Sequence, residues 1–489
     1  MSDPLLTENW ARASRELDTC DGPRGAEDTS PVTKGAGFEL RRRLACINFA
    51  KVFLIVGLVW GVVLVFLVPP LQNFDELAHY YRAWSVAEGQ LRVPASGTVE
   101  VPRSVAELPD QFPFAAIARH QAQTSLPAIP RLLWEPITHE TSPSSSFAAS
   151  YFPLGYLPQA AGISLTRLLG HSPLLSIYLG RLANLLVAVT LVAFALTLLP
   201  YGRALMFVIA LFPMTMLQMA SLSADALLIS GTFFFVALTL HYAQKACLHW
   251  LHGIVLALSA ALLLNAKPGY AALSLLVFVI PSSRFATRSR YVATMVATVA
   301  VTVALAGLIM LSAPDSREVI AQMLGANNKI NPAAQVSNMA HHPLGLVRVI
   351  DTTLGTLGLS WARSAVGWYA WGELAISDTV ALVGWLALVT VFFLREPVPI
   401  RPWQRLVLLG TSLIVAAMLT VGMYVAWTPV GGPTVLGIQG RYYYPCALTG
   451  LLGVFGFPFR RRWLVVLLML AAVALLIGSS VKTLLVYYY

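Results

Sequence analysis

Four side chains that can exchange protons or hold anions follow directly after the first hydrophobic segment. They are Asp75, Glu76, His79 and Arg82. On a helix, positions 75, 79 and 82 share one face. A carboxylate there can take a proton from a hydroxyl group, and a guanidinium can hold an anion. Because carboxylates also favour the first turn of a helix, Asp75 and Glu76 have an alternative interpretation as helix-capping residues.

The composition indicates a membrane protein. Of the 489 residues, 57% are hydrophobic and only 11% are charged, and the mean hydropathy is +0.69. A soluble domain could not bury so much apolar surface. The net charge of +10 does not indicate nucleic acid, because the basic residues lie mostly in short loops between apolar segments, where they report orientation in the membrane. We therefore expect an all-α polytopic membrane protein with no nucleic-acid partner.

Apolar segments of about 17–25 residues predict about eleven transmembrane helices. Residues 1–50 are polar and end near a basic cluster, which predicts a disordered cytoplasmic tail before a transmembrane domain over residues 51–482. The fifth and sixth segments have an alternative interpretation as a re-entrant pair. The predicted spans are 52–68, 182–199, 204–220, 226–243, 250–266, 268–281, 291–311, 379–394, 406–427, 442–458 and 463–481.

Two long segments, residues 71–181 and 312–378, are predicted to lie on the outer side of the membrane. The first contains a stretch typical of a helix in the membrane interface, whose apolar stripe consists of Leu157, Ala161, Leu165 and Leu168. Arg181 and Asn184 are interpreted as partners in helix packing. The four cysteines show no pair on the oxidising side and no spacing for metal ligands, so we expect no disulfide and no metal bound by cysteine.

The positions of the basic loops predict that the polar clusters without an evident structural role all lie on the outer side of the membrane. If these clusters converge, Asp75 would act as general base, while Lys267 and Arg441 would hold a phosphate leaving group. Asp225 or Glu76 would orient the acceptor. The alternatives are contact of Lys267 and Arg441 with lipid headgroups at span ends, and helix capping by Asp225.

Five short motifs follow one another along the chain: Asp75-Glu76-x-x-His79, Tyr151-x-Pro153-x-x-Tyr156-x-Pro158, Ser223-Ala224-Asp225-Ala226, Lys267-Pro268-Gly269-Tyr270 and Gln439-Gly440-Arg441-Tyr442. In this order they resemble a bacterial family of predicted multi-span membrane proteins of unknown function. The layout of that family is similar to that of GT-C glycosyltransferases. The resemblance covers roughly residues 50–480, and the early Asp-Glu pair with the Gln-Gly-Arg-Tyr block is its most specific part.

The resemblance implies an inverting transfer of a sugar from a polyprenyl-phosphate donor to an envelope glycan, lipid or protein. The reaction would take place at the outer face of the bacterial cytoplasmic membrane, without a metal or other cofactor. The base of such enzymes carries over to Asp75, with Glu76 as the less favoured choice. A second acidic residue of such enzymes carries over to Asp225. Apart from the resemblance, we expect substrate-binding roles for His79, Arg82, Tyr156, Lys267, Gln439, Arg441 and Tyr442.

A transporter or flippase for lipid-linked glycans is the main alternative. Such a protein is expected to have paired charges at the membrane midplane and repeat symmetry. The centres of the predicted spans carry almost no charge, which favours an enzyme. A non-enzymatic scaffold for envelope assembly is a third interpretation, in which the outer segments are docking surfaces.

Overall fold

The computed structural model describes residues 47–92, 97–120, 129–169, 172–264, 268–312, 330–393, 398–455 and 462–489. Within these ranges the chain is mostly helical, with two short two-stranded sheets, so the predicted helical class is confirmed. Most of the predicted N-terminal tail, residues 1–46, lies outside the described residues.

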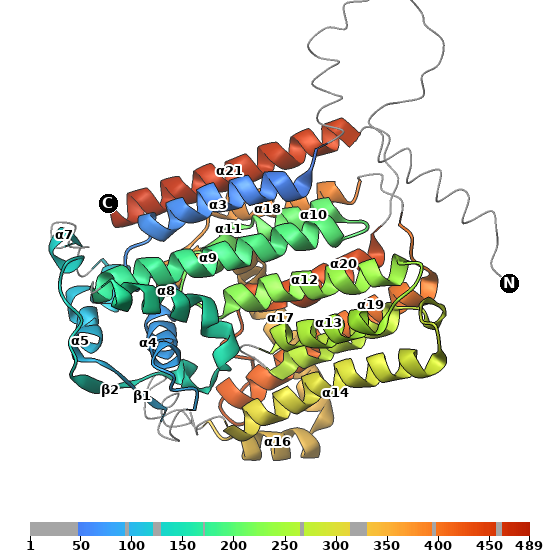
Figure 1. Ribbon diagram of the computed structural model, residues 1–489, viewed down its shortest axis with the longest axis horizontal. Coiled ribbons are helices and arrows are strands. Elements are labelled where there is room, and N and C mark those ends of the chain that lie inside the picture. Colours follow the sequence, from blue (N-terminus) through green and yellow to red (C-terminus); the bar gives the residue numbers. More distant parts are fainter. Residues whose placement is uncertain are drawn as a thin grey trace, which may run out of the picture.

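Six described helices are long and apolar enough to cross a membrane, and each overlaps a predicted span. Such segments satisfy their own backbone hydrogen bonds, as a spanning element must. Figure 1 shows the long helices running along a common direction. The six are α3 (Phe49–Leu67), α9 (Pro173–Leu198), α12 (Asp225–Gln244), α14 (Arg288–Ser312), α19 (Pro402–Trp427) and α21 (Arg462–Tyr488).

The remaining predicted spans correspond to shorter elements, so the described residues do not confirm eleven crossings. The prediction of one continuous helix over 204–220 is wrong, because α10 (Arg203–Ala210) and α11 (Pro213–Met219) divide that stretch. Proline lacks a backbone donor and forces the preceding residue out of helical geometry, and Phe212 has φ −59° and ψ 137°. The other short elements are α13 (Trp250–Ala260), η4 (Ala261–Leu263), η5 (Pro268–Val279), η6 (Ser282–Arg284), α18 (Asp378–Val391) and α20 (Tyr444–Val454).

The first segment that is predicted to be outer forms a small unit, the outer unit, at one end of the long helices (Figure 1). Its strands β1 and β2 pair antiparallel, with Thr98 opposite Ser145. Two helices connect this unit to the long helices, because α4 packs on α8 and α8 packs on α9. The elements are α4 (Glu76–Ala87), β1 (Thr98–Pro102), α5 (Arg103–Gln111), α6 (Phe114–Ala118), α7 (Ile129–Leu132), β2 (Thr141–Ser145), η2 (Phe147–Ser150), η3 (Pro153–Tyr156) and α8 (Leu157–Leu168).

Helix α8 matches the amphipathic helix predicted from the apolar stripe. Leu157, Leu165 and Leu168 are exposed, whereas Ile163 on another face is fully buried. The stripe therefore points away from the protein core, as expected for a helix that contacts lipid at the interface.

The second outer segment approaches the last part of the chain closely. It contains α16 (Pro332–His341) and α17 (Pro343–Val366), followed by a hairpin of β3 (Trp368–Tyr369), η7 (Ala370–Gly372) and β4 (Leu374–Ala375). Helix α17 packs on η8 (Gly440–Tyr443). A Cβ atom on Gly440 would lie 2.1 Å from the carbonyl oxygen of Trp361, so only glycine permits this approach.

Candidate active site

Asp75 lies at the point where the chain leaves α3 and turns into α4. It is the N-cap residue of α4 but makes no side-chain capping hydrogen bond, so the capping interpretation does not describe it. Its backbone is left-handed, with φ 58° and ψ 12°, a conformation that costs a residue with a side chain of order 1–3 kcal/mol. Its side chain keeps 26% exposure, whereas the residues around it are buried. The turn thus holds one accessible carboxylate in a fixed place.

Arg441 of η8 lies against this carboxylate. Its Nη2 atom is 3.8 Å from Asp75 Oδ2, and its Nε atom donates to Asp225 Oδ2 at 3.1 Å. Asp225 is the first residue of α12, and its backbone N–H donates to the Ser223 hydroxyl. The carboxylate of Asp225 binds Arg441. Residues separated by more than 360 positions therefore form one cluster.

The guanidinium of Arg441 is held on most sides but not on all. It lies 4.7 Å over the ring of Phe74 and 5.3 Å over the ring of Tyr442, at distances favourable for cation–π contact. The side chain is only 3% exposed. Its Nη1 atom has no hydrogen-bond partner among the described residues. A buried donor without a partner costs free energy that a ligand oxygen would recover, so this atom is suited to bind an anion.

Glu76 has a different role from its neighbour, and its predicted catalytic role is contradicted. It is fully buried, and Arg181 of α9 binds both of its oxygens, with Nε to Oε1 at 2.8 Å and Nη2 to Oε2 at 2.5 Å. Arg181 also donates to the carbonyl groups of Val65, Val68 and Pro69 at the end of α3. A carboxylate enclosed in this way cannot reach a substrate. The packing role expected for Arg181 is confirmed.

The structure also contradicts the substrate-binding role that the sequence predicts for Arg82. It is 1% exposed, and its donors bind the carbonyl groups of Tyr151, Gln90 and Leu91 and the hydroxyl of Ser85. The guanidinium therefore ties the end of α4 to two loops of the outer unit. All three nitrogens are used in this way.

His79 and Tyr156 form a buried pair next to the cluster. The Nδ1 atom of His79 lies 2.6 Å from the Tyr156 hydroxyl, and Nε2 lies 3.5 Å from the Ser223 hydroxyl. Burial raises the pKa of the Tyr156 phenol well above its usual range, so the hydroxyl keeps its proton. Both side chains are at most 4% exposed, and through Ser223 they help to position the turn that carries Asp225. Their predicted substrate-binding role stays a prediction.

The other predicted site residues lie around η8. The backbone carbonyl of Tyr442 accepts a hydrogen bond from the Tyr270 hydroxyl at 2.8 Å, and the Oε1 atom of Gln439 is buried without a partner among the described residues. Tyr270 ends the Lys267 motif and connects it to η8. Lys267 itself lies outside the described residues.

Two residues that position the site were not identified as site residues from the sequence. Gln159 of α8 donates to the carbonyl groups of Leu222 and Ser223, and Asn184 of α9 donates to those of Ser221 and Ser223. Both are buried amides on otherwise apolar helices, and that pattern is the sequence signal for them. Together they fix the turn that carries Asp225.

These observations define a polytopic helical membrane protein in which two carboxylates and a guanidinium meet at the ends of described helices. Within the described residues, no group of three or more His, Cys, Asp and Glu side chains is placed to hold a metal ion. The predicted independence of metal stays a prediction.

The chain belongs to the family described as "Predicted membrane protein (DUF2142)", whose model matches residues 58–449. This match confirms the family inferred from the motifs, and it includes every residue of the cluster. No curated protein and no solved structure matches the chain.

Proposed function

We propose that the protein is an inverting membrane glycosyltransferase that moves a sugar from a polyprenyl-phosphate donor to a cell-envelope acceptor. In this proposal the architecture is GT-C-like with about eleven crossings, the N-terminus is cytoplasmic, and the site faces outward from the bacterial cytoplasmic membrane. The reaction needs neither metal nor other cofactor.

One observation carries the proposal. An accessible carboxylate, Asp75, lies 3.8 Å from a buried guanidinium, Arg441, that has an unused donor. A base and a leaving-group clamp must act on the same reacting carbon, and this contact places both groups in one site. Because the chain is embedded in a membrane, the phosphate that such a clamp would receive is most simply carried by a lipid.

Each group then has a defined task. The acceptor hydroxyl attacks the anomeric carbon and gives its proton to the Asp75 carboxylate. The bond from that carbon to the phosphate oxygen breaks as the new glycosidic bond forms, which inverts the configuration. Arg441 stabilises the charge that develops on the departing lipid phosphate. Asp225 holds the guanidinium through Nε, which leaves Nη1 for the phosphate.

Sugar transfer by the purified protein tests the proposal. The full chain in lipid nanodiscs is incubated with a panel of radiolabelled polyprenyl-phosphate sugars and an envelope extract. We expect radiolabel to move to an acceptor from at least one donor, and not in the Asp75→Asn variant. The Asp110→Asn variant is a matched control, because Asp110 is an exposed carboxylate of the same outer unit. Absence of transfer from every donor by a folded protein would contradict the proposal.

A further inference from the structure

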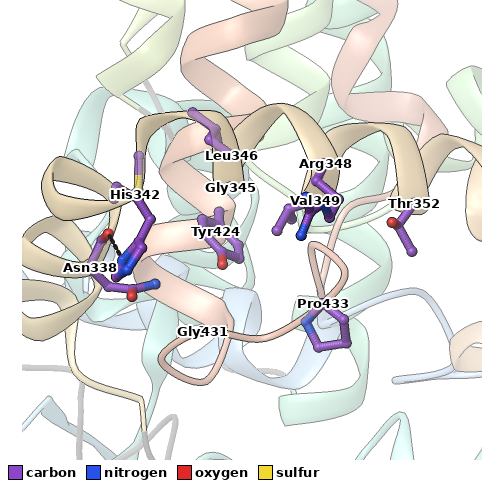
Figure 2. Close-up of a pocket in the computed structure, with 11 residues that line it drawn as sticks. Asn338, His342, Gly345, Leu346, Arg348, Val349, Thr352, Tyr424, Gly431 and Pro433 are labelled. Carbon is purple, nitrogen blue, oxygen red and sulfur yellow. Dashed lines mark hydrogen bonds between the residues drawn. The ribbon is translucent and has the colours of Figure 1, made fainter.

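A pocket of about 410 Å³ lies between α16, α17 and the loop that follows α19 (Figure 2). It is near the end of α19 from which the chain continues to η8. Its apolar wall belongs to a cluster that joins Tyr424 to Tyr442, the residue beside Arg441. The lining residues are Asn338, Met339, His342, Gly345, Leu346, Arg348, Val349, Thr352, Tyr424, Gly431 and Pro433.

The polar part of this lining favours an anion. Arg348 and Thr352 are four residues apart on α17 and share one face of that helix, and His342 and Asn338 come from the end of α16. No carboxylate is among the lining residues. Arg348 is exposed and makes no ion pair with any residue that the structure describes. The pocket thus contains a positive charge that nothing on the described chain neutralises.

His342 adds a second polar side chain to this part of the lining. Its Nδ1 atom lies 3.2 Å from the carbonyl oxygen of Asn338, a contact drawn in Figure 2. A carbonyl oxygen can only accept, so Nδ1 carries a hydrogen. The Nε2 atom then remains for a ligand.

The apolar part of the surroundings favours a lipid over a small soluble anion. Leu346, Val349 and Pro433 line the pocket. Leu344 lies one turn before Arg348 on α17 and is 81% exposed. An exposed leucine beside a patch that favours an anion suits a ligand with a charged head and an apolar chain.

We propose that this pocket binds the phosphate headgroup of a membrane lipid. Arg348 donates to the phosphate oxygens, His342, Thr352 and Asn338 complete the polar contacts, and the lipid chain lies along Leu344. The site is separate from Arg441 and does not depend on the proposed sugar transfer.

Native mass spectrometry of the full chain in a neutral detergent tests this proposal. The ligands are dioleoyl phosphatidic acid, farnesyl phosphate, farnesol and inorganic phosphate. We expect both lipid phosphates to bind more tightly than farnesol or inorganic phosphate. Losing a charge-assisted contact in Arg348→Gln should weaken their binding about tenfold or more. The Arg348→Lys variant, which keeps the charge, should retain most of the affinity, and the exposed Arg131→Gln is the matched control.

Several results would overturn the proposal. Farnesol binding as tightly as farnesyl phosphate would show that the site recognises only the apolar chain. Inorganic phosphate binding as tightly as the lipids would indicate a site for a soluble anion. Equal lipid binding by wild type and Arg348→Gln, with loss in Arg441→Gln, would place the lipid phosphate in the Asp75 cluster and not in this pocket.

Discussion

Replacing Glu76 with glutamine tests the separation of roles between the two adjacent carboxylates. The variant keeps the shape of the side chain but removes the only negative charge that contacts the Arg181 guanidinium in the described structure. Arg181 stays buried, because it also binds three carbonyl groups at the end of α3. Breaking a buried ion pair in this way costs about 3–5 kcal/mol. We expect a loss near the lower value, since glutamine still accepts one hydrogen bond.

The exposed ion pair between Arg167 and Glu88 provides a matched control. These side chains are 45% and 26% exposed, so Glu88→Gln should cost less than about 1 kcal/mol. Stability is measured by labelling the buried thiol of Cys446 with a maleimide dye during denaturant titration, with the other three cysteines replaced by serine. A loss of about 3 kcal/mol increases the labelled fraction in native buffer by more than about a hundredfold. Equal and small effects of Glu76→Gln and Glu88→Gln would refute the structural role of Glu76.

Two further variants test the positioning of the cluster. In Gly440→Ala the new Cβ meets the carbonyl oxygen of Trp361, so η8 must shift, and we expect the rate of sugar transfer to fall about a hundredfold. The control is Gly410→Ala on α19, where no atom lies within 4 Å of the new Cβ, and this variant should transfer sugar at the wild-type rate. Full activity of Gly440→Ala would contradict the argument. Tyr156→Phe removes the 2.6 Å partner of His79 Nδ1 and should lower the free energy of unfolding by about 1–3 kcal/mol, measured by the same thiol labelling. An unchanged labelling curve would show that the buried pair does not stabilise the turn.

The sequence predicts that Asp75, Asp225 and Arg441 lie on the same side of the membrane, because basic loops indicate which ends of the apolar helices share a side. That rule needs no knowledge of helix packing. It places residues far apart in the sequence on one surface, and the packing of α12 and η8 then brings them within 3.1–3.8 Å.

The roles of individual side chains could not be obtained in the same way. Glu76 and Arg181 are 105 positions apart, and only tertiary packing decides that Arg181 binds Glu76 and not Asp75. Arg82 has the right type and spacing for a site residue, but its direction is set by loops whose course the sequence pattern does not specify. The break before Pro213 was missed in the predicted span over 204–220, although proline is a sequence signal for the end of a helix at the preceding residue.

The rate of sugar transfer by Asp75→Asn with saturating donor tests the central claim most directly. The asparagine keeps the size of the side chain but cannot accept the proton of the acceptor hydroxyl. The account predicts that donor binding is retained while the transfer rate falls by about 10²–10⁴-fold, with Asp110→Asn unaffected. Transfer by Asp75→Asn at the wild-type rate would contradict the assignment of Asp75 as the base.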